Sequence, residues 1–132
     1  MSHQNVEIVR KMWTVWTSEE MSTWLDFLHP EIEWHTRGDE PDAGVYRGRE
    51  EVEKLMQFWD DNFDGLQVHA EEFIAAGERV VVPSRVSGRG RSSGVEAELH
   101  YTFVYAVRDG KIIEVREFTG KEKALEAVGL DE

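Results

Sequence analysis

The sequence contains no cysteine among its 132 residues, so disulfide bonds, thiolate nucleophiles and thiolate metal ligands are all excluded. It also lacks an apolar run of membrane-spanning length. The first residues, Met1 to Asn5, have neither the basic nor the apolar region of a signal peptide. We therefore expect a soluble, cytoplasmic protein that has no membrane partner.

Basic residues are scarce. Lys and Arg total 15 against 27 Asp and Glu, which gives a formal charge of −12. This charge repels nucleic acid phosphates, so a nucleic acid partner is not expected. The sequence also contains no Gly-rich phosphate loop, no dinucleotide fingerprint and no GxSxG elbow. Nothing in it calls for a cofactor.

Metal-ligating patterns are equally sparse. His29, His35 and Asp39 lie close in sequence, but no third ligand follows at helical or strand spacing. We therefore predict no metal site.

The apolar residues that are present indicate one domain over residues 1–132, with helices first and strands second. Helical spacing predicts a first helix through Val6 and Trp16. A second helix is expected after a capping box at residues 17–20, and Pro30 closes it. A short strand over 32–36, a third helix through Val52 and Phe63, and four strands near 66–75, 80–86, 96–107 and 112–119 follow, with a last helix over 121–128. Separate runs of helices and strands favour an α+β fold.

The strongest local signal is Asp109-Gly110 between two alternating apolar runs, which predicts a hairpin with a two-residue turn. In that register Val107 lies opposite Ile112, and Thr102 lies opposite Glu117. One face is then expected to carry His100, Thr102, Val104, Ala106, Ile113, Val115, Glu117 and Thr119. The other face is an aromatic stripe of Tyr101, Phe103, Tyr105 and Phe118. We expect a second copy of the chain to cover this stripe, giving a homodimer.

Glu117 is the first candidate for catalysis, because apolar neighbours on its face suit a carboxyl group that exchanges protons. His100 is the candidate partner, since diagonal neighbours on paired strands come within reach of one another. The alternatives are a solvated or Arg-paired Glu117 at a pocket rim and a purely structural His100.

Several aromatic residues are candidates to line a pocket for a flat apolar ligand: Trp34, Tyr46, Trp59 and Phe73. Tyr46, in the loop before Gly48, is a candidate gate at the pocket mouth. The alternative is that these rings fill the core, with Tyr46 packed over a sheet edge.

The order of elements resembles the nuclear transport factor two-like cone, in which a strongly curved antiparallel sheet, also described as cystatin-like, wraps around three N-terminal helices. Short stretches make the chain similar to the SnoaL-like family: Leu28-His29-Pro30-Glu31-Ile32-Glu33-Trp34, Gly44-Val45-Tyr46-Arg47-Gly48-Arg49, Gly88-Arg89-Gly90, Arg108-Asp109-Gly110-Lys111-Ile112 and Ala124-Leu125-Glu126-Ala127. The resemblance implies a deep apolar pocket. The resemblance does not predict one reaction, because the superfamily includes isomerases, epoxide hydrolases, polyketide cyclases and noncatalytic proteins.

The resemblance also implies roles for single residues. Glu117 matches a carboxylate in the last strand of limonene epoxide hydrolase relatives, and Arg85 lies one position from the arginine of their middle strand, without its aspartate. Thr36 and Thr102 stand where ketosteroid isomerases place catalytic aspartates, so steroid isomerase chemistry is disfavoured. Their hydroxyls, with Val115 and Thr119 beside Glu117, are expected to contact the substrate.

These observations together predict a SnoaL-like protein that binds a small hydrophobic molecule. Glu117, supported by His100, is its candidate acid/base for isomerisation, cyclisation or hydrolysis. The alternative is a noncatalytic ligand-binding or assembly module of the same fold.

Overall fold

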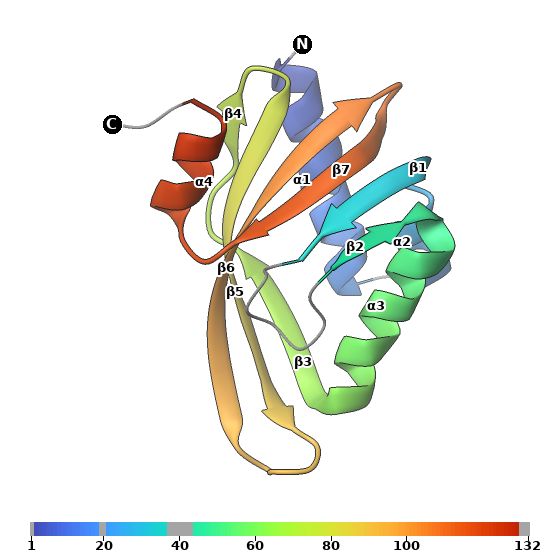
Figure 1. Ribbon diagram of the computed structural model, residues 1–132, viewed down its shortest axis with the longest axis vertical. Coiled ribbons are helices and arrows are strands. Elements are labelled where there is room, and N and C mark those ends of the chain that lie inside the picture. Colours follow the sequence, from blue (N-terminus) through green and yellow to red (C-terminus); the bar gives the residue numbers. More distant parts are fainter. Residues whose placement is uncertain (1, 19–20, 37–43, 130–132) are drawn as a thin grey trace.

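The computed structural model describes residues 2–18, 21–36 and 44–129 (Figure 1). The elements in chain order are α1 (Ser2–Ser18), α2 (Met21–Leu25), β1 (Leu28–His35), β2 (Val45–Arg47), α3 (Gly48–Asn62), β3 (Phe63–Ala70), β4 (Ile74–Ala76), β5 (Arg79–Gly90), β6 (Glu96–Arg108), β7 (Lys111–Phe118) and α4 (Lys121–Ala127). No helix in these ranges is both long and apolar enough to cross a bilayer.

The strands form one curved, unclosed sheet in the order β2-β1-β7-β6-β5-β3, with β4 paired to β5 outside this path. Every pairing is antiparallel except that of β1 with β7, which is parallel. The predicted α+β class is confirmed. The parallel pair brings the N-terminal and C-terminal parts of the chain together and sets Trp34 beside Val115.

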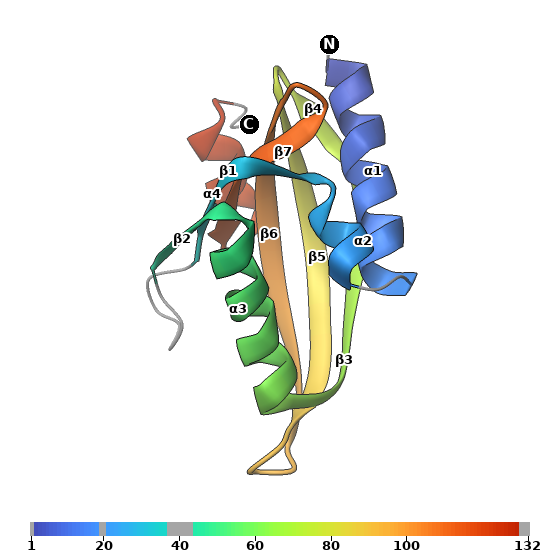
Figure 2. The same cartoon turned by 90° about the vertical axis from the view of Figure 1, so that its right-hand side faces the viewer.

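Helices α1, α2 and α3 pack on the concave face of the sheet (Figure 2). The spacing of Val6, Val9 and Trp13 puts these side chains on one side of α1, where each is at least nine-tenths buried. On α3, Val52 and Leu55 do the same. The start of α3 carries Glu50 and Glu51, which suit the positive end of a helix dipole.

Helix α4 packs on the opposite, convex face of the sheet (Figure 1). Its Ala124 is fully buried in a small cluster with Val81 and Val104, and Phe118 packs against this cluster. Beyond this cluster, alternate residues of β5 and β6 place mostly polar side chains on the convex face.

The structure corrects the boundaries around α2. This helix ends at Leu25, whereas Leu28 and Pro30 belong to β1, which begins four residues earlier than predicted. Leu28 pairs with Ile112 and is fully buried, so the sheet and not a helix takes its side chain. The predicted capping box includes Glu19 and Glu20, which lie outside the described residues.

A bulge in the β6–β7 hairpin changes which residues share a face. Asp109 and Gly110 form the predicted turn with φ angles of 53° and 75°, and Val107 pairs with Ile112 as expected. The next pair is Ala106 with Glu114, so Ile113 is an extra residue on β7. A shift of one residue moves every later side chain to the other face relative to β6.

The predicted pairing of Thr102 with Glu117 is therefore wrong. Glu117 pairs with Phe103, and Thr102 pairs with Phe118. The predicted outer stripe is wrong for the same reason. Tyr101, Phe103 and Tyr105 are buried in the concave core, whereas Phe118 lies with the α4 cluster. The four rings do not form an exposed surface together. The aromatic stripe therefore no longer gives a reason to expect a homodimer.

Candidate functional site

A pocket of about 430 Å³ lies between α3 and the concave face of the sheet. This volume is in the range of cavities that hold small organic molecules. Its walls come from seven elements, and the lining residues are Trp16, Trp34, Glu53, Met56, Gln57, Trp59, Asp60, Leu66, Val68, Val86, Tyr101, Phe103 and Glu117. Large apolar and aromatic side chains predominate, so the pocket suits a flat apolar molecule.

Glu117 is the charged group on the sheet side of this pocket. Its Oε2 accepts a hydrogen bond of 2.6 Å from Nε1 of the Trp34 indole, which projects from the neighbouring strand β1. The Trp34 side chain is 1% exposed and contacts Phe103 with ring centroids 6.0 Å apart. A donor on so rigid a ring fixes the direction of the carboxylate, which is what proton transfer to a bound molecule requires.

Tyr105 lies next to this carboxylate on the concave face, and its side chain is fully buried. Burial raises the pKa of the Tyr105 hydroxyl well above its ordinary value. The hydrogen bond with Trp13 lowers this pKa in part, and the negative charge of Glu117 raises it by a smaller amount. The hydroxyl therefore stays protonated and neutral over the physiological range.

Helix α3 supplies the rim of the pocket. Met56 and Trp59 are half-buried and point towards the sheet, whereas Glu53, Gln57 and Asp60 are exposed. The Trp59 ring packs edge-on against Tyr101, with centroids 5.9 Å apart and planes at 84°. The rim is thus acidic where the inner walls are aromatic.

Of the residues predicted to form a site, the structure brings Trp34, Trp59 and Glu117 together at this pocket. Val115 is fully buried in the core and, in the β6 register, lies opposite Tyr105. The other predicted substrate contacts do not line the pocket: Thr36, Tyr46, Phe73, Thr102 and Thr119.

Each of these five has another environment. Tyr46 lies on β2 opposite Trp34, and Thr36 Oγ1 exchanges hydrogen bonds with the backbone of Gly44. The Phe73 ring lies under the Arg10 guanidinium at 4.6 Å. Thr102 is buried on the convex face, and Thr119 is exposed after β7.

The predicted pair of His100 and Glu117 is wrong, because the bulge puts the two side chains on opposite faces of the sheet. His100 is 62% exposed on the convex face, with Nε2 3.6 Å from Oε1 of Glu98. Arg85 also lies on that face, in ion pairs with Glu71 and Glu98 at 3.3 and 3.6 Å. Neither side chain lines the pocket that holds Glu117.

Several lining residues were not predicted from the sequence, above all Tyr101 and Phe103. Alternation along β6 assigns its side chains to two faces of the sheet. It does not tell which of the two faces is turned inward. Trp16 and Met56 follow the helical spacing of buried neighbours, and this pattern alone does not separate a pocket wall from core packing.

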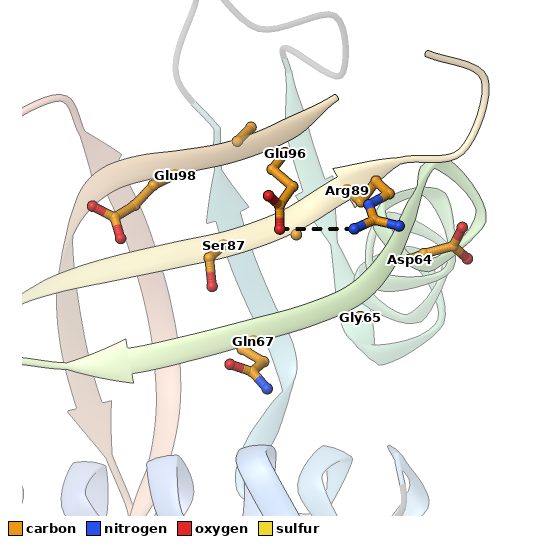
Figure 3. Close-up of a pocket in the computed structure, with 9 residues that line it drawn as sticks. Asp64, Gly65, Gln67, Ser87, Arg89, Glu96 and Glu98 are labelled. Atoms are coloured by element: carbon orange, nitrogen blue, oxygen red, sulfur yellow. Dashed lines mark ion pairs between the residues drawn. The ribbon is translucent and has the colours of Figure 1, made fainter. Parts of the chain in front are cut away.

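A second, open hollow of about 610 Å³ lies on the convex face, where β3, β5 and β6 run side by side (Figure 3). Gln67, Ser87 and Glu98 project into it from three adjacent strands, and Arg89 pairs with Glu96 at 3.8 Å. It lacks the aromatic walls of the first pocket. We therefore take the concave pocket as the candidate site.

One group of side chains has the spacing of metal ligands. Ligand atoms of Glu33, His35 and Glu114 lie within 4.8 Å of one another. Arginines already pair with both carboxylates: Arg47 with Glu33 at 3.4 Å, and Arg79 and Arg116 with Glu114 at 3.1 and 3.3 Å. Their positive charges oppose a bound cation, so we interpret the group as an ion-pair network. Asp39, also considered as a ligand, lies outside the described residues.

Burial of Glu114 acts to raise its pKa, but the hydrogen bond and charge of Arg116, with the charges of Arg79 and His35, outweigh it. The pKa of Glu114 therefore lies below its ordinary value of 4.5. A carboxyl group with a lowered pKa stabilises the fold above its unfolded-state pKa, and this contribution is lost as the pH falls through the folded-state pKa.

Glu114→Gln is expected to lower the free energy of unfolding at pH 7 by about 1 kcal/mol, because it removes the charge that Arg79 and Arg116 bind. The difference from wild type should shrink as the pH falls below 4.5, where the wild-type carboxylate becomes protonated. Urea unfolding at several pH values measures both effects, with Glu78→Gln in an exposed turn as the control. A constant difference at all pH values would contradict the account.

Comparison with solved structures finds the same fold in proteins of low sequence identity. A nuclear transport factor two-like protein from Burkholderia thailandensis has a TM-score of 0.82 and 26% identity over 97% of this chain and 98% of its own. A putative SnoaL-like polyketide cyclase from Jannaschia has a TM-score of 0.75 and 21% identity over 98% and 94%. A protein of ketosteroid isomerase-like fold from Catenulispora acidiphila, in complex with trimethylamine, has a TM-score of 0.74 and 15% identity over 94% and 93%.

No curated protein matches the sequence. A family model does: the SnoaL-like domain matches residues 9–115, a range that runs from α1 to Val115 of β7 and includes most of the pocket walls. Because this match spans most of the chain, the protein belongs to the SnoaL-like domain family, as the resemblance of its motifs indicated.

Proposed function

We propose that this protein binds a small hydrophobic molecule in the concave pocket and that Glu117 exchanges a proton with it. The observation that carries the proposal is the position of Glu117. Its carboxylate lies at an aromatic-walled pocket, and the Trp34 indole holds it in one direction by a hydrogen bond of 2.6 Å. A site with one oriented carboxylate among aromatic inner walls is suited to general acid/base chemistry.

The simplest step for this arrangement begins with the carboxylate of Glu117 taking a proton from an acidic carbon of the ligand. The C–H electron pair then delocalises into an adjacent carbonyl group, and the protonated Glu117 returns the proton to another atom of the same molecule. Isomerisation and cyclisation both follow this pattern. In hydrolysis, Glu117 instead takes a proton from a water molecule as that water attacks the ligand.

Similar proteins favour a small hydrophobic ligand for this pocket, although the reactions associated with them differ. The similar structures include a putative SnoaL-like polyketide cyclase and a protein of ketosteroid isomerase-like fold. Identities below 25% indicate a shared fold alone, so the substrate class is our inference from the pocket. The aromatic rings of Trp16, Trp34 and Trp59 favour compounds with flat rings.

A thermal-shift screen of wild type and Glu117→Gln tests the proposal, with apolar ketones, enols, epoxides and aromatic polyketides as compounds. We expect one class to raise the melting temperature of both proteins, because the amide keeps the shape of the carboxyl group. Val86→Trp, which fills the pocket, is the control and should show no shift with the same compounds.

The other outcomes separate the two parts of the proposal. A compound that stabilises both proteins but is converted by neither supports binding and contradicts catalysis, which favours the noncatalytic ligand-binding module. If no compound shifts the wild type, while Glu117→Gln itself changes the melting temperature, the carboxylate is structural and the proposed function is wrong.

A further inference from the structure

We infer that the pocket prefers ligands whose polar end is a cation, such as a protonated amine or a quaternary ammonium group, over neutral or anionic molecules of the same shape. This inference rests on the proposed function, because it names the substrate class of the same pocket. Three observations carry it: the sign of the lining charges, the arrangement of the rings and the positions of the nearby arginines.

The charged side chains that line the pocket, among the described residues, are all carboxylates: Glu53 and Asp60 at the rim and Glu117 at the sheet. The other polar side chains of the lining, Gln57 and Tyr101 among them, are uncharged. A ligand carboxylate or phosphate entering here meets negative charge at the rim and again at the sheet. A cation is attracted at both levels.

The aromatic walls favour the same charge. The Trp16 and Trp34 rings both meet the Phe103 ring nearly at right angles, at 75° and 73°, with centroids 6.1 and 6.0 Å apart. Trp59 meets Tyr101 at 84° across the other side of the lining. All five of these rings line the pocket, and an ammonium group that meets the face of such a ring is attracted to it.

The arginines near the pocket are held away from it. Arg91 donates from Nε to the backbone carbonyl of Asp60 and pairs through its other nitrogen with the Asp64 carboxylate at 2.8 Å. Arg85 and Arg89 lie on the convex face, in ion pairs with Glu98 and Glu96. Their positive charges are paired outside the lining and do not make the pocket a site for anions.

The inference is tested by calorimetric titration of the wild type with three probes of one shape: 2-naphthylmethylamine, 2-naphthylmethanol and 2-naphthoate. We expect the protonated amine to bind about tenfold more tightly than the alcohol, and the carboxylate to bind more weakly than both. Raising the salt concentration should reduce the advantage of the amine, because the rim carboxylates are exposed to solvent.

A double variant, Glu53→Gln with Asp60→Asn, removes the rim charges and should reduce the preference for the amine over the alcohol about threefold. The matched control is Glu96→Gln with Glu98→Gln, which changes the net charge equally but alters the convex hollow of Figure 3. This control should leave the preference as in the wild type.

The results separate the two proposals. Equal affinity for amine and alcohol, or tighter binding of the carboxylate, overturns the inference and leaves the apolar pocket standing. Absence of binding by all three probes at about 1 mM counts against the proposed function itself, and the inference falls with it.

Discussion

Replacing Glu117 by Gln is expected to reduce the turnover of any compound that the wild type converts by about 10²- to 10⁴-fold, the usual contribution of a general acid/base. The affinity for a neutral substrate should change by no more than about threefold. The amide oxygen still accepts the hydrogen bond from the Trp34 indole, so the pocket keeps its shape. The amide cannot exchange a proton at neutral pH, so the chemical step is lost.

The measurement is a comparison of kcat and KM for the two proteins with the same substrate. Glu98→Gln is the matched control, because Glu98 lies on the neighbouring strand and faces the convex hollow. It should retain wild-type kcat. A Glu117→Gln protein with kcat within about twofold of the wild type would contradict the role of Glu117 as acid/base.

Val86→Trp is expected to weaken ligand binding by about 100-fold or more, because a Trp ring at this position occupies the space of the ligand. Val86 is 6% exposed, lies on β5 between Val68 and Leu99, and lines the pocket of about 430 Å³. That space should receive the ring at a cost of about 1–3 kcal/mol in stability, so the variant should fold.

Calorimetric titration with a ligand from the screen measures the loss, and circular dichroism confirms that the variant folds. Ser87→Trp is the control, since it puts the same ring on the next residue of the strand, which points to the convex hollow. Undiminished binding by Val86→Trp, or an equal loss in both variants, would contradict the location of the site.

Much of the fold follows from local patterns in the sequence. The spacing of Val6, Val9 and Trp13 predicts α1 because a helix that buries one side repeats its apolar residues every three or four positions. Asp109-Gly110 predicts the hairpin because both residues must adopt positive φ angles, and both do. These signals involve residues that are neighbours in the chain.

The wrong hairpin register and the missed contact of Trp34 with Glu117 come from features that local patterns do not encode. Ile113 is a β-branched residue that fits an ordinary strand, so nothing marked it as the extra residue of a bulge. The bulge nevertheless decides that Glu117 faces Phe103 and not Thr102. The parallel pairing of β1 with β7 joins segments about eighty residues apart, and it alone brings Trp34 to Glu117.

The candidate site was therefore predictable in part. Glu117, Trp34 and Trp59 were recognised because a carboxylate among apolar neighbours and large rings in predicted elements are unusual enough to notice. Phe103 and Tyr101 were assigned to the outside because the predicted register lacked the bulge. The same error put His100 beside Glu117, although its side chain lies on the opposite face.

The central claim, that the ligand occupies the concave pocket beside Glu117, is tested most directly by ¹⁹F NMR of protein labelled with 5-fluorotryptophan. Three tryptophans, Trp16, Trp34 and Trp59, line the pocket, whereas Trp13 and Trp24 lie outside its lining. Single Trp→Phe variants assign the five resonances. On titration with a ligand from the screen, we predict the largest shifts at Trp16, Trp34 and Trp59. A saturating ligand that leaves these three resonances in place would show that it binds elsewhere and would contradict the account.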